Sequence, residues 1–219
     1  EIMPSLVGSE MCIRDSREPS MKTCLIVIDV QESFRHRPFF TERDLPAYLR
    51  AQNALIDGCV AQGIPVLRVF HSDGPEVAEN PFSQASGQVR ALDGLAPFEA
   101  AATFTKSRHS ALVGTGLDVW LTRHGIQRLI ISGIRTEQCC ETTTRHASDL
   151  GWDVDYVTDA TLTWDMVQPD GQVLAAADIK IRTATVLQGR FATLCTVQQA
   201  LDRACLLYTS DAADDTPCV

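Results

Sequence analysis

Several features that would point to a membrane, a nucleotide or a nucleic acid are missing from this sequence. No apolar run approaches the roughly 20 residues needed to cross a bilayer, so no membrane association is expected. There is no glycine-rich phosphate-binding loop, and we expect no cofactor. The 219 residues carry 28 acidic and 19 basic side chains, and no basic stripe is present to follow a phosphate backbone, so nucleic acid is not an expected partner. These absences favour a small-molecule ligand.

The cysteines lack any metal-binding or disulfide framework. The chain has eight cysteines with no CxxC spacing and no interleaved histidine pairs. Five of them fall in residues 21–204, namely Cys24, Cys59, Cys139, Cys140 and Cys195. An odd number without a framework is typical of a reducing compartment. Because a buried-strand pattern follows Met21 without a signal peptide, we expect a cytoplasmic protein.

The two terminal segments look foreign to the rest of the chain. Codons for residues 11–16 can be chosen so that their reverse complement encodes Cys-Leu-Leu-Tyr-Thr, which is the sequence of residues 205–209. This pairing is typical of a transposon end from library preparation, translated at both edges of an insert. We therefore expect residues 1–20 and 205–219 to be non-native, disordered tails around a single domain at 21–204. That domain is only mildly acidic, with 21 acidic and 17 basic residues.

Within residues 21–204, short apolar runs alternate with longer amphipathic segments. The runs predict strands at 23–28, 65–70, 128–132 and 154–157, with weaker candidates at 103–105 and 192–195. The amphipathic segments predict helices at 45–62, 116–124, 137–150 and 172–187, and Gly63, Gly125 and Gly151 mark three helix ends. This alternation predicts an α/β fold in three layers (αβα), with a mostly parallel six-stranded sheet covered on both faces.

Reactive side chains follow four of the predicted strands. Asp29 ends the first strand, His71 follows the second and Lys106 follows the third. The fourth strand leads through Gly133 to Cys139 at the start of a helix. Ligands of open α/β sheets bind at the carboxyl ends of the strands, so we expect these side chains to meet there. The segment from 71 to 102 is rich in glycine, proline and serine, and we expect it to pass over the rim of the site.

These positions and their neighbours resemble the isochorismatase-like cysteine hydrolases. The matching residues are Asp29-Val30-Gln31; Lys106-Ser107-Arg108-His109-Ser110-Ala111-Leu112 with Thr115 and Leu117; Gly133-Ile134-Arg135-Thr136-Glu137-Gln138-Cys139 with Thr142 and Thr143; and Gly151 with Asp159-Ala160. The resemblance implies a Rossmann-like sheet, a homodimer or larger homo-oligomer, and a catalytic triad formed here by Asp29, Lys106 and Cys139. It also implies a non-proline cis peptide at Ile134-Arg135, with an oxyanion hole formed by the backbone N–H groups of Arg135 and Cys139.

The three residue types also fit hydrolytic chemistry by themselves. A cysteine at a helix N-terminus, beside a lysine and a proton acceptor, has its thiolate favoured, and we expect this of Cys139. Asp29 would carry the thiol proton to the departing nitrogen, and Lys106 would hold Asp29 ionised. The sequence therefore predicts cleavage of a C–N amide or ureido bond of a small molecule through a thioester acyl-enzyme.

Other interpretations of the same residues remain open. Taken singly, Asp29 could cap a turn, Lys106 could be a solvated surface charge and Cys139 could be a small buried residue. An isochorismatase-type vinyl-ether hydrolase, which does not need a cysteine here, is one alternative function. A catalytically silent dimerising module of the same fold is the other.

The remaining expectations concern the pocket. Phe34, His71, Arg135 and Trp164 are the candidate substrate-binding residues, although His71 could be an ordinary loop histidine. Arg135 stands where many relatives carry a small residue, so it could recognise a carboxylate or a carbonyl. Cys140 is expected to be buried in packing. No metal is expected, because the segment 70–74 lacks the Asp-x-His spacing of relatives that hydrolyse nicotinamide.

Overall fold

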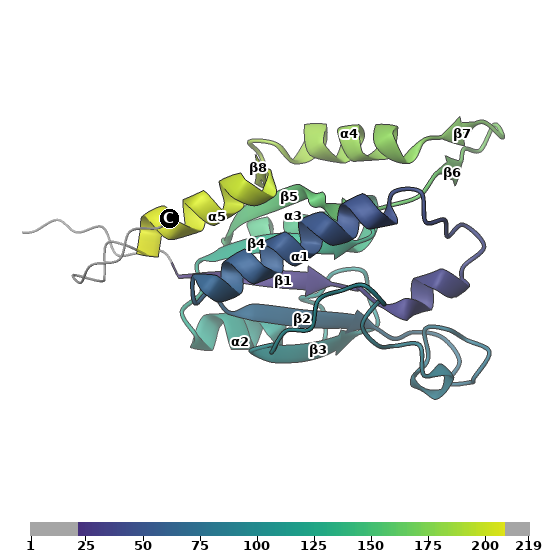
Figure 1. Cartoon of the computed structure of the whole chain (residues 1–219), viewed down its shortest axis with the longest axis horizontal. Helices are drawn as coiled ribbons and strands as arrows, with labels where there is room; N and C mark the ends of the chain where they lie inside the picture. Colours follow the sequence, from purple (N-terminus) through teal and green to yellow (C-terminus); the bar gives the residue numbers. More distant parts are fainter. Residues whose placement is uncertain (1–21, 209–219) are drawn as a thin grey trace, which may run out of the picture.

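A computed structural model describes residues 22–208 of the chain. Six parallel strands form its central sheet in the order β3-β2-β1-β4-β5-β8 (Figure 1). The strands are β1 (Thr23–Ile28), β2 (Val66–His71), β3 (Ala102–Lys106), β4 (Arg128–Ile134), β5 (Asp153–Leu162) and β8 (Thr193–Cys195). The predicted α/β fold is confirmed.

The central strand β1 explains why this sheet forms. All six of its residues are buried, and it pairs in parallel with β2 on one side and β4 on the other. A strand covered on both faces needs a continuous β-branched and aliphatic run, which Thr23–Ile28 provides. The chain winds outward from β1 through β2 to β3, and then returns to β4 on the opposite side. The order therefore reverses between β1 and β4, where such folds bind ligands.

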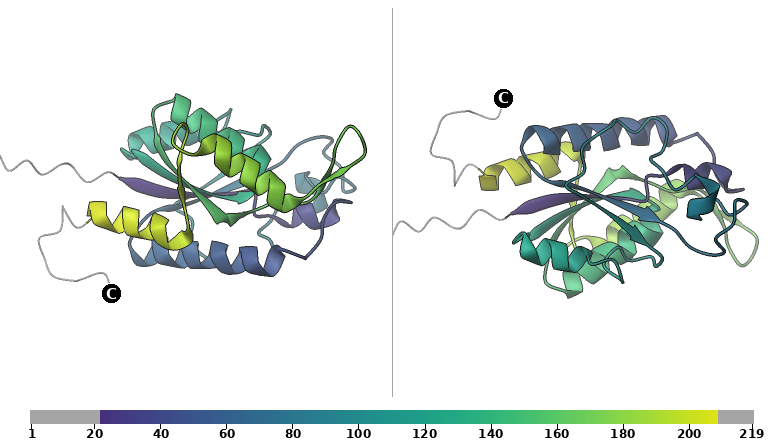
Figure 2. Two further views of the ribbon diagram at one scale, coloured as in Figure 1. Left: turned by 90° about the horizontal axis from the view of Figure 1, so that it is seen from above. Right: turned by 90° about the horizontal axis from the view of Figure 1, so that it is seen from below.

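Helices cover both faces of the sheet, as Figure 2 shows. They are α1 (Leu45–Ala61), α2 (Leu117–Arg123), α3 (Glu141–Asp149), α4 (Ala176–Leu187) and α5 (Val197–Tyr208). Helices α1 and α5 pack on one face with strand residues such as Leu25 and Val27. Residues of α2, α3 and α4 pack on the other face with Cys24, Ile26 and Ile28. No helix in the described part of the chain is long and apolar enough to cross a membrane.

Helix ends agree with the sequence at three glycines and differ from it elsewhere. Gly63, Gly125 and Gly151 follow the ends of α1, α2 and α3 with φ of 69°, 65° and 94°, a backbone conformation that favours glycine. The helix expected from residue 172 begins only at Ala176, because β7 (Val173–Leu174) pairs antiparallel with β6 (Met166–Val167) in a hairpin.

Two further segments correct the sequence-based boundaries. The helix expected at 137–150 begins as a π-helical turn, Thr136–Cys140, and becomes α-helical only from Glu141. Helix α5 was not predicted, and it continues to Tyr208, which is past the domain boundary expected at residue 204. Arg203 anchors this helix by an ion pair with the buried Asp155 at 3.1 Å. The expected tails at 1–20 and beyond residue 208 lie outside the described residues.

Candidate active site

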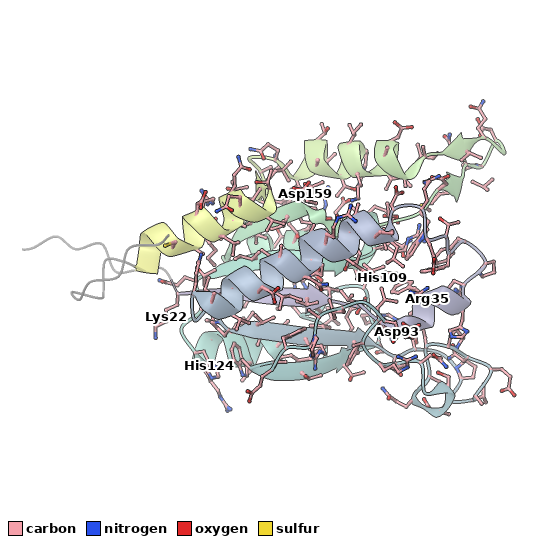
Figure 3. The ribbon with its side chains drawn as sticks, viewed as in Figure 1. Lys22, Arg35, Asp93, His109, His124 and Asp159 are labelled. Atoms are coloured by element: carbon pink, nitrogen blue, oxygen red, sulfur yellow. The ribbon has the colours of Figure 1, made fainter. Side chains whose placement is uncertain are left out.

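The reactive residues predicted at the strand ends lie together. Asp29 follows β1, His71 ends β2, Lys106 ends β3, and Cys139 lies in the turn that follows β4. Their strands are four consecutive members of the sheet, so their carboxyl ends share one edge. This edge lies at the end of the molecule where Figure 3 labels His109, and it includes the point where the strand order reverses.

The Lys106 ammonium group joins the other three side chains. Its Nζ lies 2.7 Å from Asp29 Oδ2, 2.8 Å from His71 Nδ1 and 3.3 Å from Cys139 Sγ. Two of these contacts are hydrogen bonds, to His71 and Cys139, and the contact with Asp29 is an ion pair. Lys106 is 2% exposed and Asp29 is fully buried. The interpretation of Lys106 as a solvated surface charge is therefore wrong.

Local backbone geometry places Asp29 at this centre. Its φ of 53° is in the left-handed region, which aspartate tolerates better than β-branched residues do. Its N–H bonds to Val69 O at 2.8 Å. The side chain of Gln31 then brackets the backbone of His71, accepting from its N–H at 2.7 Å and donating to its carbonyl at 2.9 Å. Gln31 was noted only as part of a motif, and it holds the ends of β1 and β2 in register.

Cys139 is positioned by an unusual exit from β4. Gly133 has φ of 128°, and a Cβ there would lie 2.0 Å from Ile28 O, so only glycine fits beside β1. The peptide between Ile134 and Arg135 is cis, as the resemblance implied. A π-helical turn then carries Cys139 over the ends of the strands, held by Tyr156 Oη donating to the Thr136 carbonyl at 2.8 Å.

Burial and charge set the protonation of the cluster. Burial raises the pKa of Asp29, and Lys106 partly opposes that rise. Burial also disfavours charge on Lys106, but Asp29 and Cys139 outweigh it and raise the pKa of Lys106. For Cys139, burial and the Asp29 charge raise the pKa to about 12 despite Lys106. The expected thiolate is therefore not favoured in the free site. The helix N-terminus and Lys106 do not compensate for burial next to a carboxylate.

His71 is neutral in this arrangement. Burial and the Lys106 charge lower its pKa to about 4. Because Lys106 can only donate, Nδ1 of His71 accepts its hydrogen bond and Nε2 carries the ring proton. His71 is therefore a fixed component of the cluster, and its second nitrogen remains a donor beside the cavity.

A cavity of about 450 Å³ opens above the cluster. Its lining residues are Asp29, Phe34, Arg37, Phe39, His71, Asp73, Gly74, Pro75, Asn80, Phe82, His109, Arg135, Gln138 and Cys139. Three of the four predicted pocket residues are among them. Trp164 is not: it is 3% exposed and packs behind the wall, with its ring centre 5.6 Å from that of Phe34 and 5.3 Å from that of Phe39.

Much of the cavity wall was not predicted residue by residue. The segment expected over the rim does supply part of the lining, from Asp73 to Phe82. Arg37, Phe39 and His109 were missed, because nothing in their spacing sets them apart from surface residues. Cys140 is fully buried in the core below the cavity, as expected.

Asp29, His71 and Cys139 are also close enough to share a metal ion, with their ligand atoms all within 4.8 Å of one another. Lys106 Nζ, however, is in contact with all three side chains. A metal ion bound by the same atoms would have to displace this ammonium group. The absence of a metal remains a prediction.

Comparisons with known proteins identify the family of this chain. An isochorismatase domain model matches residues 23–199. The isochorismatase family protein YrdC of Bacillus subtilis is 26% identical over 83% of this chain and 95% of its own length. Nicotinamidase 3 of Arabidopsis thaliana is 27% identical over 68% of this chain and 78% of its own length. The crystal structure of an isochorismatase from Pseudomonas putida superposes with a TM-score of 0.73, at 26% identity, covering 83% of this chain and 92% of that one. The chain therefore belongs to the isochorismatase family of hydrolases.

Proposed function

We propose that this protein hydrolyses a C–N bond of a small amide or ureide, with Cys139 as the nucleophile. The observation that carries the proposal is the contact of one buried ammonium, Lys106 Nζ, with both Asp29 and Cys139 beside a cavity. A carboxylate, an ammonium and a thiol together supply a proton carrier, an electrostatic stabiliser and a nucleophile.

The first half of the reaction forms an acyl-enzyme. Asp29 takes the proton of the Cys139 thiol as sulfur attacks the carbonyl carbon, and the carbonyl electron pair moves onto oxygen. The backbone N–H groups of Arg135 and Cys139 stabilise this oxyanion, and one such donor is worth about 3 kcal/mol of barrier lowering. Asp29 then passes the proton to the nitrogen as the C–N bond breaks. An amine or ammonia leaves, and a thioester remains on Cys139.

The second half regenerates the enzyme. Asp29 takes a proton from a water molecule as the water oxygen attacks the thioester carbonyl. The C–S bond breaks, the acid is released and the proton returns to sulfur. Lys106 stays protonated throughout and offsets the negative charge as it moves between Asp29 and Cys139. Because burial and the Asp29 charge raise the pKa of Cys139, we expect its thiolate to form only as sulfur attacks.

Two findings favour C–N cleavage over the vinyl-ether alternative. The alternative does not need a thiol here, whereas Cys139 lies in the cavity with its sulfur already in contact with Lys106. One sequence relative is a nicotinamidase by name. The substrate is a small molecule that fits the cavity of about 450 Å³, a volume within the usual range for such ligands.

The direct test measures ammonia release from a panel of small amides and ureides. The parent should turn over at least one compound, and Cys139→Ala should reduce the rate by about three orders of magnitude or more. Cys195→Ser is the matched control, because Cys195 lies on the edge strand β8 and does not line the cavity. Parent-like hydrolysis by Cys139→Ala, or turnover of a vinyl ether alone, would contradict the proposal.

Self-association is a separate proposal that follows from the family resemblance. We propose a homodimer or larger homo-oligomer. Val167 and Val173 of the hairpin and Ile181 of α4 are large exposed apolar residues that an interface could cover. Light scattering after gel filtration would test it, and a monomer at micromolar concentration would contradict it.

A further inference from the structure

Arg135 is a buried guanidinium group with unused hydrogen-bonding capacity at the cavity. The residue is 7% exposed, and it lines the cavity together with Cys139. Its Nε lies 3.2 Å from Glu137 Oε1 and 3.4 Å from Thr163 Oγ1. Its Nη2 is buried and has no hydrogen-bond partner among the described residues, and the same is true of both carboxylate oxygens of Glu137. Buried donors of a charged group are costly when unpaired, so this atom suggests a ligand.

Aromatic rings hold this guanidinium in place. Its central carbon lies 4.7 Å from the ring centre of Phe39 and 5.8 Å from that of Trp164. Trp164 is itself fixed by a hydrogen bond from Nε1 to the Thr41 carbonyl at 3.0 Å. A guanidinium stacked on rings and tethered at Nε has lost most of its freedom before a ligand arrives, which lowers the entropic cost of binding. This also gives a role to Trp164, which does not line the cavity.

The chemistry of this group favours a carboxylate. The planar guanidinium fork matches the two oxygens of a carboxylate, and such charge-assisted pairs are about twice as strong as neutral hydrogen bonds. Glu137, whose carboxylate is largely buried, forms an ion pair with Nε and offsets part of the positive charge, while the Nη atoms remain for a ligand. At the rim, Arg37 adds a second cation and Asp73 an opposing carboxylate. A single negative group on the ligand is therefore the best match for Arg135.

We propose that Arg135 binds the carboxylate of the substrate, so that this enzyme acts on small amide or ureido acids. The carboxylate lies on Arg135, and the amide or carbamoyl carbon lies at Cys139 in the same cavity. The carboxylate site does not depend on the proposed hydrolase function; only the placement of the reacting carbon at Cys139 rests on it. It assigns to Arg135 a specificity role that is separate from the bond-breaking step.

The test compares acids with their neutral amides. N-carbamoylglycine is paired with N-carbamoylglycinamide, and succinamic acid is paired with succinamide. Loss of one charge-assisted hydrogen-bonded contact corresponds to roughly a 10- to 100-fold change in affinity. We expect the parent to prefer at least one acid over its amide by that factor, mainly through KM. Arg135→Gln should abolish the preference and Arg135→Lys should retain part of it. Arg68→Gln is the control, since Arg68 stacks on Phe98 at 4.3 Å and does not line the cavity.

Binding to the Cys139→Ser variant, measured by calorimetry, separates this inference from the hydrolase proposal. Acid-selective binding that disappears in Cys139→Ser/Arg135→Gln supports the carboxylate site even if the parent turns over none of the compounds. Hydrolysis by the parent without any acid preference overturns the carboxylate site and leaves the hydrolase standing. If Arg135→Gln does not fold, the acid–amide comparison in the parent decides, and equal or absent binding of both members of each pair overturns the inference.

Discussion

Removing the Lys106 ammonium while keeping Asp29 should leave a buried carboxylate without its ion-pair partner and so destabilise the folded protein. The two charged atoms are 2.7 Å apart, and at an effective dielectric constant of about 20 their attraction is roughly 6 kcal/mol. Desolvation of both groups offsets much of that gain, whereas breaking such a pair from one side typically costs about 3–5 kcal/mol. We therefore expect Lys106→Met to lower the free energy of unfolding by about 3–5 kcal/mol at pH 8.

The loss should depend on pH in a defined direction. Burial already raises the pKa of Asp29, and removing Lys106 raises it further. A carboxyl whose folded pKa exceeds its unfolded pKa binds a proton on folding, so the variant regains stability as pH falls through the folded pKa. The stability of Lys106→Met should thus approach that of the parent as pH falls from 8 to 5.5. Asp29→Asn/Lys106→Met should be less destabilised than Lys106→Met, and its difference from the parent should change less with pH, with the remaining change coming from His71, whose pKa Lys106 helps to lower.

Urea unfolding at both pH values measures these free energies. Lys180→Met is the control, because Lys180 is partly buried and its Nζ donates to a neutral group, the Thr158 carbonyl, at 3.4 Å. The stability lost in Lys180→Met should not be smaller at pH 5.5 than at pH 8. A Lys106→Met deficit below about 1 kcal/mol, or one that is equal at the two pH values, would refute the reasoning.

Three further outcomes are expected. The folded pKa of His71 is about 4, so the unfolded chain binds a proton first as pH falls. Below pH 6.5 the parent should therefore lose about 1–2 kcal/mol more stability than His71→Gln, a range that allows for the partial exposure of the ring. Urea titrations would measure this difference. Gly133→Ala should lower the free energy of unfolding by more than about 4 kcal/mol, because its Cβ would lie 2.0 Å from Ile28 O. Gly171 has φ of 86° and open space around it, so Gly171→Ala should lower the free energy of unfolding by only about 1 kcal/mol. Thermal melts of both variants would test this contrast. With a pKa of about 12, Cys139 should react with iodoacetamide about tenfold faster per pH unit from pH 7 to 9; a plateau in peptide-mapped labelling would contradict the raised value.

The strands and the catalytic candidates were predictable because local pattern determines them. A buried parallel strand needs a run such as Thr23–Ile28, and strand ends in such a sheet share one edge. Asp29, Lys106 and Cys139 could therefore be placed together from the order of the elements. The role of His71 as a third partner of Lys106 was only partly foreseen, since it depends on which ring nitrogen faces the ammonium.

The features that were missed depend on long-range contacts or on burial. The hairpin replaces the first turn of the expected helix at 172 because Val173 pairs with Val167, a contact that helical periodicity does not report. Trp164 lies behind the cavity wall because the rings of Phe34 and Phe39 cover it. The protonation of Cys139 was mispredicted because the sequence shows which charges are near the thiol but not how deeply it is buried.

The most direct measurement is a search for an acyl group on Cys139 during turnover. The parent is mixed with the best amide or ureide substrate, quenched with acid, and digested for mass spectrometry. We predict that the peptide containing Cys139 carries the acyl mass, that hydroxylamine removes it, and that no adduct forms on that peptide in Cys139→Ala. Turnover by the parent with no adduct on Cys139, together with undiminished turnover by Cys139→Ala, would contradict the proposed mechanism.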